Sequence, residues 1–229
     1  MALPRWTEDG AAISRRRLLV QAAAGGAALC GGLPSARAAS DRDLRFRCLW
    51  QGSEIGEHRV AFRAEADRLV VETYIEITAK VLFFTVFSLR HEAREVWQGG
   101  RLQAVVARTQ SEGRSLEVAG EAVGDGFRVV GKDGPFLAAG HLLTSDALWD
   151  SRIVEAARLI DVQHGGEIGL VTKRLGKASV ETPRGRIRAT RHRIITPYYA
   201  GSLFYDEEQR WVKALVEFKG ETLEYALAT

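Results

Sequence analysis

The fold is decided by the stretch Leu69-Val70-Val71-Glu72-Thr73-Tyr74-Ile75-Glu76-Ile77. Its odd-numbered positions hold four aliphatic residues and a threonine, while both of its glutamates stand at even-numbered positions. Successive side chains of a β-strand point to opposite faces of the sheet. The alternation therefore predicts a strand with one face against a core and the other face in water.

The same alternation recurs on both sides of this stretch, with turn residues between the runs. It extends from Leu44 to Trp50, from His58 to Ala64, from Arg186 to Ile195 and from Trp211 to Phe218. Roughly ten to twelve such runs follow one another at about ten-residue spacing. Thr182-Pro183-Arg184-Gly185 predicts a tight reversal, because Pro fixes φ and Gly accepts a positive φ. The pattern predicts an all-β, mainly antiparallel fold, as a strongly curved sheet or an open barrel.

Two segments depart from the alternation. Val81 to Phe87 is apolar on both faces, which suits a strand covered on two sides or a short buried helix. Between His141 and Ile160 the alternation is lost, and Asp146 or Ser151 is a candidate helix cap. Helical spacing there joins Ile153, Ala156, Ala157 and Ile160. We therefore expect one short helix packed against the sheet.

The N-terminal segment has the features of a targeting signal. Ser14-Arg15-Arg16-Arg17-Leu18-Leu19 resembles the twin-arginine export signal, in which two arginines precede apolar residues. The small residues Ala36 and Ala38 form a small-x-small cleavage pattern. The intervening apolar run is short and rich in glycine, which disfavours the alternative of a membrane anchor. We expect a cleavable signal peptide over residues 1–38 and a single β-rich periplasmic domain over 39–229, which meets a membrane only during export.

Charge and cysteine content limit the partners and the stabilising chemistry. The chain carries a formal net charge of +3, but residues 1–38 hold five basic and two acidic residues, so residues 39–229 hold 27 of each. A neutral domain of this kind does not predict a nucleic-acid partner. Cys48 is the only cysteine of residues 39–229, and its apolar strand context predicts a buried side chain. An apolar core, without a disulfide, must then hold the domain together.

Catalytic and metal-binding motifs are missing from the sequence. No two of its five histidines stand at the spacing of metal ligands, and no glycine-flanked serine nucleophile is present. Fragments of a nucleophilic site occur in the irregular region, as Ser145 beside Asp146 and Asp161 near His164. The sequence therefore predicts neither a metal nor a cofactor, and a hydrolase ranks third among its functions.

Two sets of residues are candidates for ligand binding. Phe84, Trp149, Tyr198 and Phe204 belong to an aromatic set that either lines an apolar cavity or fills the core. Arg186 and Arg188 share one strand face with His192, which suits an anionic head-group or an acidic polymer. The alternative for these arginines is cross-strand pairing with acids such as Glu217 or Glu221.

A family resemblance rests on several of these segments. They are the turn Thr182–Gly185 with the strand after it, the run Leu203–Ala214, the segment Trp50–Phe62, and Leu142–Ser145 followed by Trp149. Together they resemble the secreted bacterial domain-of-unknown-function family 6134, over nearly all of residues 39–229. The resemblance implies a periplasmic β-rich fold and transfers no catalytic residue.

The first functional hypothesis is a non-catalytic periplasmic domain that binds an apolar or lipid-like molecule in the concave face of the sheet. The second is an envelope protein that binds another protein through a sheet edge. The sequence leaves the oligomeric state open.

Overall fold

The computed structural model describes residues 42–81, 84–218 and 220–228. The predicted signal peptide, with Arg15, Arg16, Ala36 and Ala38, lies outside the described residues. Within them the chain is almost entirely β, and no helix is long and apolar enough to cross a membrane. The all-β prediction is confirmed.

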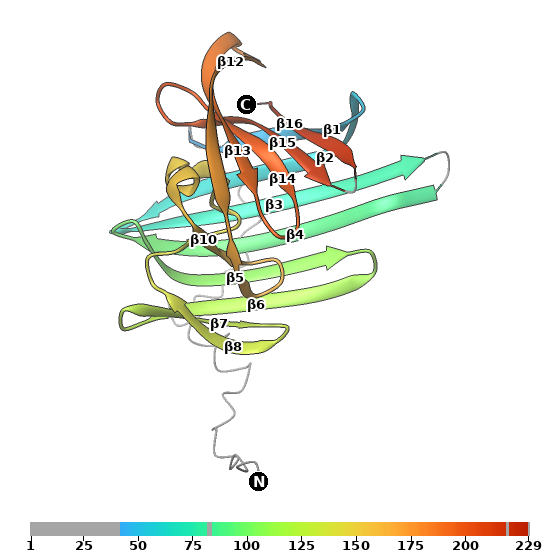
Figure 1. Cartoon of the computed structure of the whole chain (residues 1–229). Coiled ribbons are helices and arrows are strands. Elements are labelled where there is room, and N and C mark those ends of the chain that lie inside the picture. Colours follow the sequence, from blue (N-terminus) through green and yellow to red (C-terminus); the bar gives the residue numbers. More distant parts are fainter. Residues whose placement is uncertain (1–41, 82–83, 219, 229) are drawn as a thin grey trace, which may run out of the picture. The chain divides into compact units, whose positions relative to one another are not determined.

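One antiparallel sheet dominates the described residues (Figure 1). Its thirteen strands follow the order β12-β13-β14-β15-β16-β1-β2-β3-β4-β5-β6-β7-β8. The last strand of the chain therefore pairs with the first, in the middle of the sheet. The two halves are meanders, and the sheet keeps two free edges, β12 and β8.

The first meander comprises β1 (Leu44–Trp50), β2 (Ser53–Glu65), β3 (Arg68–Val81), β4 (Phe84–Gln98), β5 (Arg101–Ser111), β6 (Arg114–Val123), β7 (Gly126–Gly131) and β8 (Gly134–Ala139). The second comprises β12 (Val171–Thr182), β13 (Gly185–Ile195), β14 (Ala200–Tyr205), β15 (Trp211–Phe218) and β16 (Glu221–Leu227). Short hairpin turns join neighbouring strands within each meander, as the turn residues of the sequence predict.

The β3–β4 hairpin extends past its neighbours, as Figure 1 shows. β2 pairs with β3 only as far as Ile77, and β5 pairs with β4 only from Leu89 onward. The pairs beyond these points have no third strand beside them, and Phe84 is 74% exposed and Val86 50% exposed. The prediction that this apolar run is covered on two sides is therefore wrong for Phe84 and Val86, because they lie beyond the ends of the neighbouring strands β2 and β5.

Between the two meanders the chain forms an insert, residues 142–170, with a small sheet of order β11-β10-β9. Its elements are β9 (Leu143–Thr144), the 3₁₀ turns η1 (Ala147–Trp149) and η2 (Ser151–Glu155), β10 (Arg158–Asp161) and β11 (Gly166–Gly169). The predicted helix is thus two short 3₁₀ turns, and Ile160 belongs to a strand. Asp150, rather than Asp146 or Ser151, accepts the capping hydrogen bond, from the backbone N–H of Arg152.

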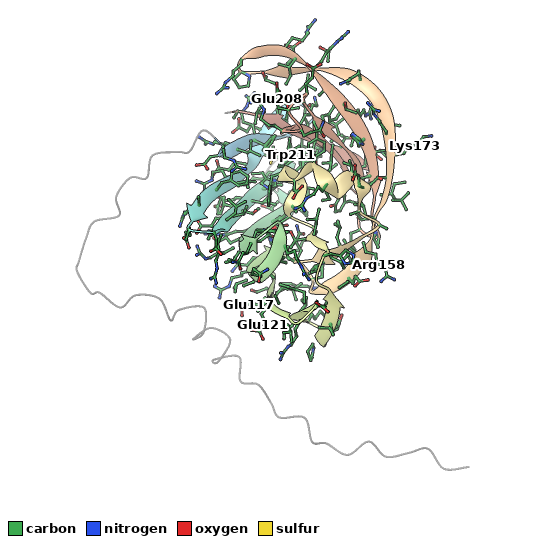
Figure 2. All side chains as sticks on the ribbon, turned by 90° about the vertical axis from the view of Figure 1, so that its left-hand side faces the viewer. Glu117, Glu121, Arg158, Lys173, Glu208 and Trp211 are labelled. Carbon is green, nitrogen blue, oxygen red and sulfur yellow. The ribbon has the colours of Figure 1, made fainter. Side chains whose placement is uncertain are left out.

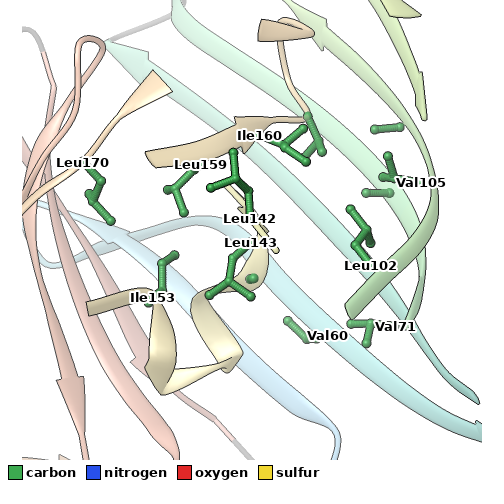
Figure 3. Packing of buried hydrophobic residues seen from close by; sticks show 14 of the residues in the cluster. Val60, Val71, Leu102, Val105, Leu142, Leu143, Ile153, Leu159, Ile160 and Leu170 are labelled. Atoms are coloured by element: carbon green, nitrogen blue, oxygen red, sulfur yellow. The ribbon is translucent and has the colours of Figure 1, made fainter. Parts of the chain in front are cut away.

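The insert and the inner face of the large sheet share one apolar core (Figure 3). Leu143 and Leu159 of the insert belong to the same buried cluster as Val60 and Leu102 of the sheet. Burial of such side chains is worth about 1.5 to 3 kcal/mol each. Cys48 is fully buried, as predicted, and burial raises the pKa of its thiol to about 12.

Two buried polar contacts fix the beginning of the insert to the sheet. The Thr144 hydroxyl donates to Glu95 at 2.5 Å, and the indole N–H of Trp97 donates to the other oxygen of Glu95 at 2.9 Å. His91 Nε2 lies 2.7 Å from Asp146 Oδ2. Glu95 and His91 have no solvent exposure, so each contact is made in a medium where an unpaired polar group would be costly.

Substitution of Glu95 by Gln should reduce the pH dependence of stability. Burial and the nearby Asp146 raise the pKa of Glu95 to about 7. The folded state therefore keeps a proton that the unfolded state loses above about pH 4.5, and stability falls as the pH rises through 7. We expect the melting temperature to fall less steeply between about pH 5 and pH 8 in E95Q than in the unchanged protein.

The control is Glu92→Gln, since Glu92 is exposed and paired with Arg90 on the same strand. E92Q should keep the slope of the unchanged protein. The buried His91 contributes in the same direction: burial lowers its pKa, but the charges of Asp146, Glu95 and Asp161, with the hydrogen bond to Asp146, together raise it above its usual value. Some slope should therefore remain in E95Q, and an unaltered slope would contradict the assignment.

His58 should have the opposite effect to Glu95 and make the protein less stable at acidic pH. Its ring is 1% exposed among Phe46, Trp211 and Tyr225, and neither ring nitrogen has a hydrogen-bond partner in the described residues. Burial lowers its pKa to about 4, against the pull of Asp146. Stability is therefore lost as the pH falls from about 6.5 through 4.

The variant His58→Leu should unfold less readily than the unchanged protein at about pH 4.5, and equally or less readily at neutral pH. Denaturant unfolding at the two pH values measures this. The exposed His141, changed to Leu, is the control and should show neither effect. An H58L protein that loses stability at both values would show that the imidazole has a partner.

Candidate functional site

The four aromatic residues predicted to line a cavity do not come together. The Trp149 ring packs edge-on against Phe62 and Trp97, with centroids 5.3 and 5.8 Å away. Phe204 is buried on the other side of the sheet, in a small outer cluster. Tyr198 is half exposed, and Phe84 stands on the projecting β3–β4 hairpin. No single cavity therefore collects them.

The concave face, predicted to bind an apolar molecule, is occupied by the insert. Figure 3 shows Leu142, Leu143 and Ile160 of the insert facing the sheet strands that carry Leu102 and Val105. Two surface hollows formed by described residues lie elsewhere, one on the β12–β13 hairpin and one beside the turn between β5 and β6. The binding of an apolar ligand stays a prediction, and the packing of the described residues does not favour it.

The fragments of a hydrolase have structural partners. His164 Nδ1 lies 2.8 Å from Asp161, which also accepts the backbone N–H of Gln163, and the imidazole stacks on Tyr198. The Ser145 hydroxyl accepts the backbone N–H of Val162 at 3.2 Å. These contacts stabilise the turn after β10 and do not pair a serine with an imidazole. The described residues also hold no group of three or more His, Cys, Asp or Glu that could bind a metal.

Arg186 and Arg188, the two predicted arginines, lie on the β12–β13 hairpin, in the part that pairs with no third strand. Its turn is the predicted reversal: β12 ends at Thr182, and Gly185 opens β13 with φ +104°. β13 pairs with β14 only from Thr190 onward, so residues 185–189 pair with β12 alone. In Figure 1 this hairpin, in orange, rises beyond the neighbouring strands.

The two faces of the hairpin have different environments. Val180 and Ala189 are buried against Phe204 and Val212, in the outer cluster. On the opposite face Ser179 is exposed near the turn, whereas Thr190 is buried and His192 half-buried against Tyr205 nearer the base of the hairpin. Four exposed cations lie on this face: Arg174 and Lys177 from β12, and Arg186 and Arg188 from β13. We call these four residues the cationic face.

Few of these cations are neutralised. Arg186 pairs with Glu181 at 2.5 Å, whereas no salt bridge joins Arg174, Lys177 or Arg188 to an acid in the described residues. The predicted pairing with Glu217 is made instead by Arg193, on the other face. Burial and then the charge of Arg174 lower the pKa of the adjacent His192. The cationic face therefore presents positive charge that its own domain does not balance.

The charge of the hairpin contrasts with the rest of the domain. Residues 171–195 hold eight Lys or Arg and one acidic residue, while the remainder of residues 39–229 holds 19 basic and 26 acidic residues. The zero net charge of residues 39–229 is therefore the sum of a strongly basic hairpin and an acidic remainder. The polar residues Lys177, Ser179, Arg186 and Arg188 also line a shallow hollow of about 440 Å³.

The outer side of the hairpin is an open sheet edge. β12 is the terminal strand of the large sheet and pairs only with β13 among the described strands. It is twelve residues long and contains no Pro. Figure 2 shows Lys173, on this strand, pointing away from the domain. The opposite edge, β8, has only six residues and carries Pro135.

Sequence reasoning identified Arg186 and Arg188 but missed Arg174 and Lys177. β12 carries a register shift between Arg174 and Gly176, and this bulge brings Arg174 and Lys177 onto the same face although they are an odd number of residues apart. Strict alternation would have placed them on opposite faces. The glycine within an otherwise regular strand is the signal that could have revealed the bulge.

Comparison with known proteins gives the fold and the family. No curated protein sequence matches the chain. A crystal structure of a β-barrel-like protein of domain of unknown function DUF1849 from Brucella abortus is similar, with a TM-score of 0.57 and 7% sequence identity, covering 82% of this chain and 95% of that one. This likeness concerns the fold alone. The family model for the domain of unknown function DUF6134 matches residues 46–228, so the chain belongs to the DUF6134 family.

Proposed function

We propose that this protein is a non-catalytic envelope protein, exported through the leader of residues 1–38, that binds an acidic chain-like ligand on its cationic face. The observation that carries the proposal is the set of exposed cations without counter-ions, Arg174, Lys177 and Arg188, on a body that is otherwise acidic. Cations left unpaired beside an excess of acid elsewhere favour an external anionic partner over internal pairing.

The chemistry of the face suits carboxylate or phosphate groups. Guanidinium groups bind both anions through two parallel hydrogen bonds, and such charge-assisted bonds are about twice as strong as neutral ones. The hydroxyl of Ser179, between Lys177 and the turn, adds a neutral donor on the same face. These groups bind anions and offer no activated nucleophile.

The dimensions of the face indicate several anionic groups rather than one. Along β12 the cationic face extends from Arg174 to the level of Glu181, which pairs with Arg186. At about 3.3 Å per residue this row is roughly 20 Å long. A single phosphate or carboxylate would reach one or two cations, whereas a chain with repeated anionic groups reaches all of them.

A flexible chain fits the hairpin better than a flat surface does. The bulge between Arg174 and Gly176 bends β12, with Gly176 at φ +103°. Such bulges increase the local twist of a strand. A bilayer would touch only part of a twisted face, while a flexible polymer can follow it.

The double substitution Lys177→Gln and Arg188→Gln tests the proposal. We expect binding of the full-length protein to soluble polyglutamate or polyphosphate, at low salt, to weaken by at least about tenfold. The salt dependence of the affinity should also become less steep, since fewer ions are released on binding. Fluorescence anisotropy with labelled polymers measures both quantities.

The matched control is the double substitution Arg108→Gln and Arg158→Gln. It removes the same charge from exposed arginines outside the hairpin, which pair with Glu117 and Glu167. This variant should keep the affinity of the unchanged protein. An equal loss in both variants, or binding only to vesicles with anionic lipid and to neither polymer, would overturn the proposal.

A further inference from the structure

We infer that the acidic ligand is an extended polypeptide that adds as a new strand to the open edge of β12, beside residues 177–182. This inference rests on the proposed function and names the kind of partner. Three features support it: the unpaired backbone groups of β12, the positive charge beside them, and the polar and apolar sides of this edge.

The edge offers a row of backbone groups for pairing. β12 hydrogen-bonds to β13 along its length, from Val171 opposite Ile195 to Thr182 opposite Gly185, and has no other strand partner in the described residues. The backbone N–H and C=O groups on its outer side are therefore open to a strand. Peptides bind such edges by extending the sheet.

The usual protections of an edge strand are weak on β12. Natural edges are shortened, interrupted by Pro or charged. The β8 edge is short and has Pro135, whereas residues 177–182 of β12 form a regular segment after the bulge, without Pro. The protections that β12 does have are the bulge between Arg174 and Gly176, which lies outside residues 177–182, and positive charge.

Positive charge makes this edge selective for its partner. A second copy of the chain would bring Lys177 and the arginines of the cationic face against themselves, and like charges across strands are destabilising. An acidic strand meets the same cations favourably. The edge therefore disfavours self-association through β12 and favours an acidic polypeptide.

The two sides of the edge indicate the sequence pattern of the partner. On one side stand Lys177 and Ser179 with Arg188 next to them, all exposed. On the other side Ala178 and Val180 belong to the outer apolar cluster. A strand added here would place alternate side chains on these two sides. Alternating acidic and apolar residues match both.

The experiment compares a blocked, labelled peptide Glu-Val-Glu-Val-Glu-Val with the same peptide N-methylated at every backbone nitrogen. N-methylation keeps the charges and removes the donors that strand addition needs. With the full-length protein we expect the first peptide to bind at least about tenfold more tightly than the second. Hydrogen exchange should slow at outward-facing amides of residues 177–182 only with the first peptide.

Two controls separate this inference from the proposed function. K177Q should weaken binding of the first peptide, whereas Arg108→Gln, outside the hairpin, should not. If both peptides and polyphosphate bind equally, without new amide protection, strand addition is overturned while the cationic face retains its function. If neither the peptides nor the polymers bind, both proposals fail.

Discussion

An open sheet of thirteen strands has an inner face that water must not reach, and the structure depends on how that face is covered. The insert of residues 142–170 covers it, with Leu143, Leu159 and Ile160 buried against the strands. Glu95 with Thr144, and His91 with Asp146, hold the beginning of the insert in register on β4. Without this insert the inner side chains of both meanders would lose buried apolar residues of their common core.

Covering the inner face determines where a ligand can bind. Because the concave side is packed, the surfaces that remain open are the outer face, the projecting hairpins and the two edges. Among these, β12–β13 combines unpaired cations with an open edge strand. Its apolar side is at the same time anchored on Phe204 and Val212, so the hairpin is held in place while its other side faces solvent.

The residues that sequence reasoning overlooked carried a readable signal. His91, Ala93, Glu95 and Trp97 share one strand face, so two titratable residues stand among buried positions of β4. A charged residue on the apolar side of a strand predicts a buried partner. The partner itself could not be predicted, because Thr144 is 49 residues away and joins Glu95 only after the insert has folded onto the sheet. The opposite error concerns Phe84, which the sequence placed in a run covered on two sides. It is exposed because the neighbouring strands end before they reach it.

The sequence by itself determined three features: side-chain alternation predicts the antiparallel strands and the burial of Cys48, and the Pro and Gly of Thr182–Gly185 predict the reversal of the chain. Each of these follows from interactions within a few residues or from the two-residue period of a strand. Only the tertiary structure decided that β16 closes on β1, that the irregular segment fills the concave face, and that β12 is an open edge. These features depend on contacts between residues distant in sequence, whose formation depends on how the whole sheet curves and where its strands end.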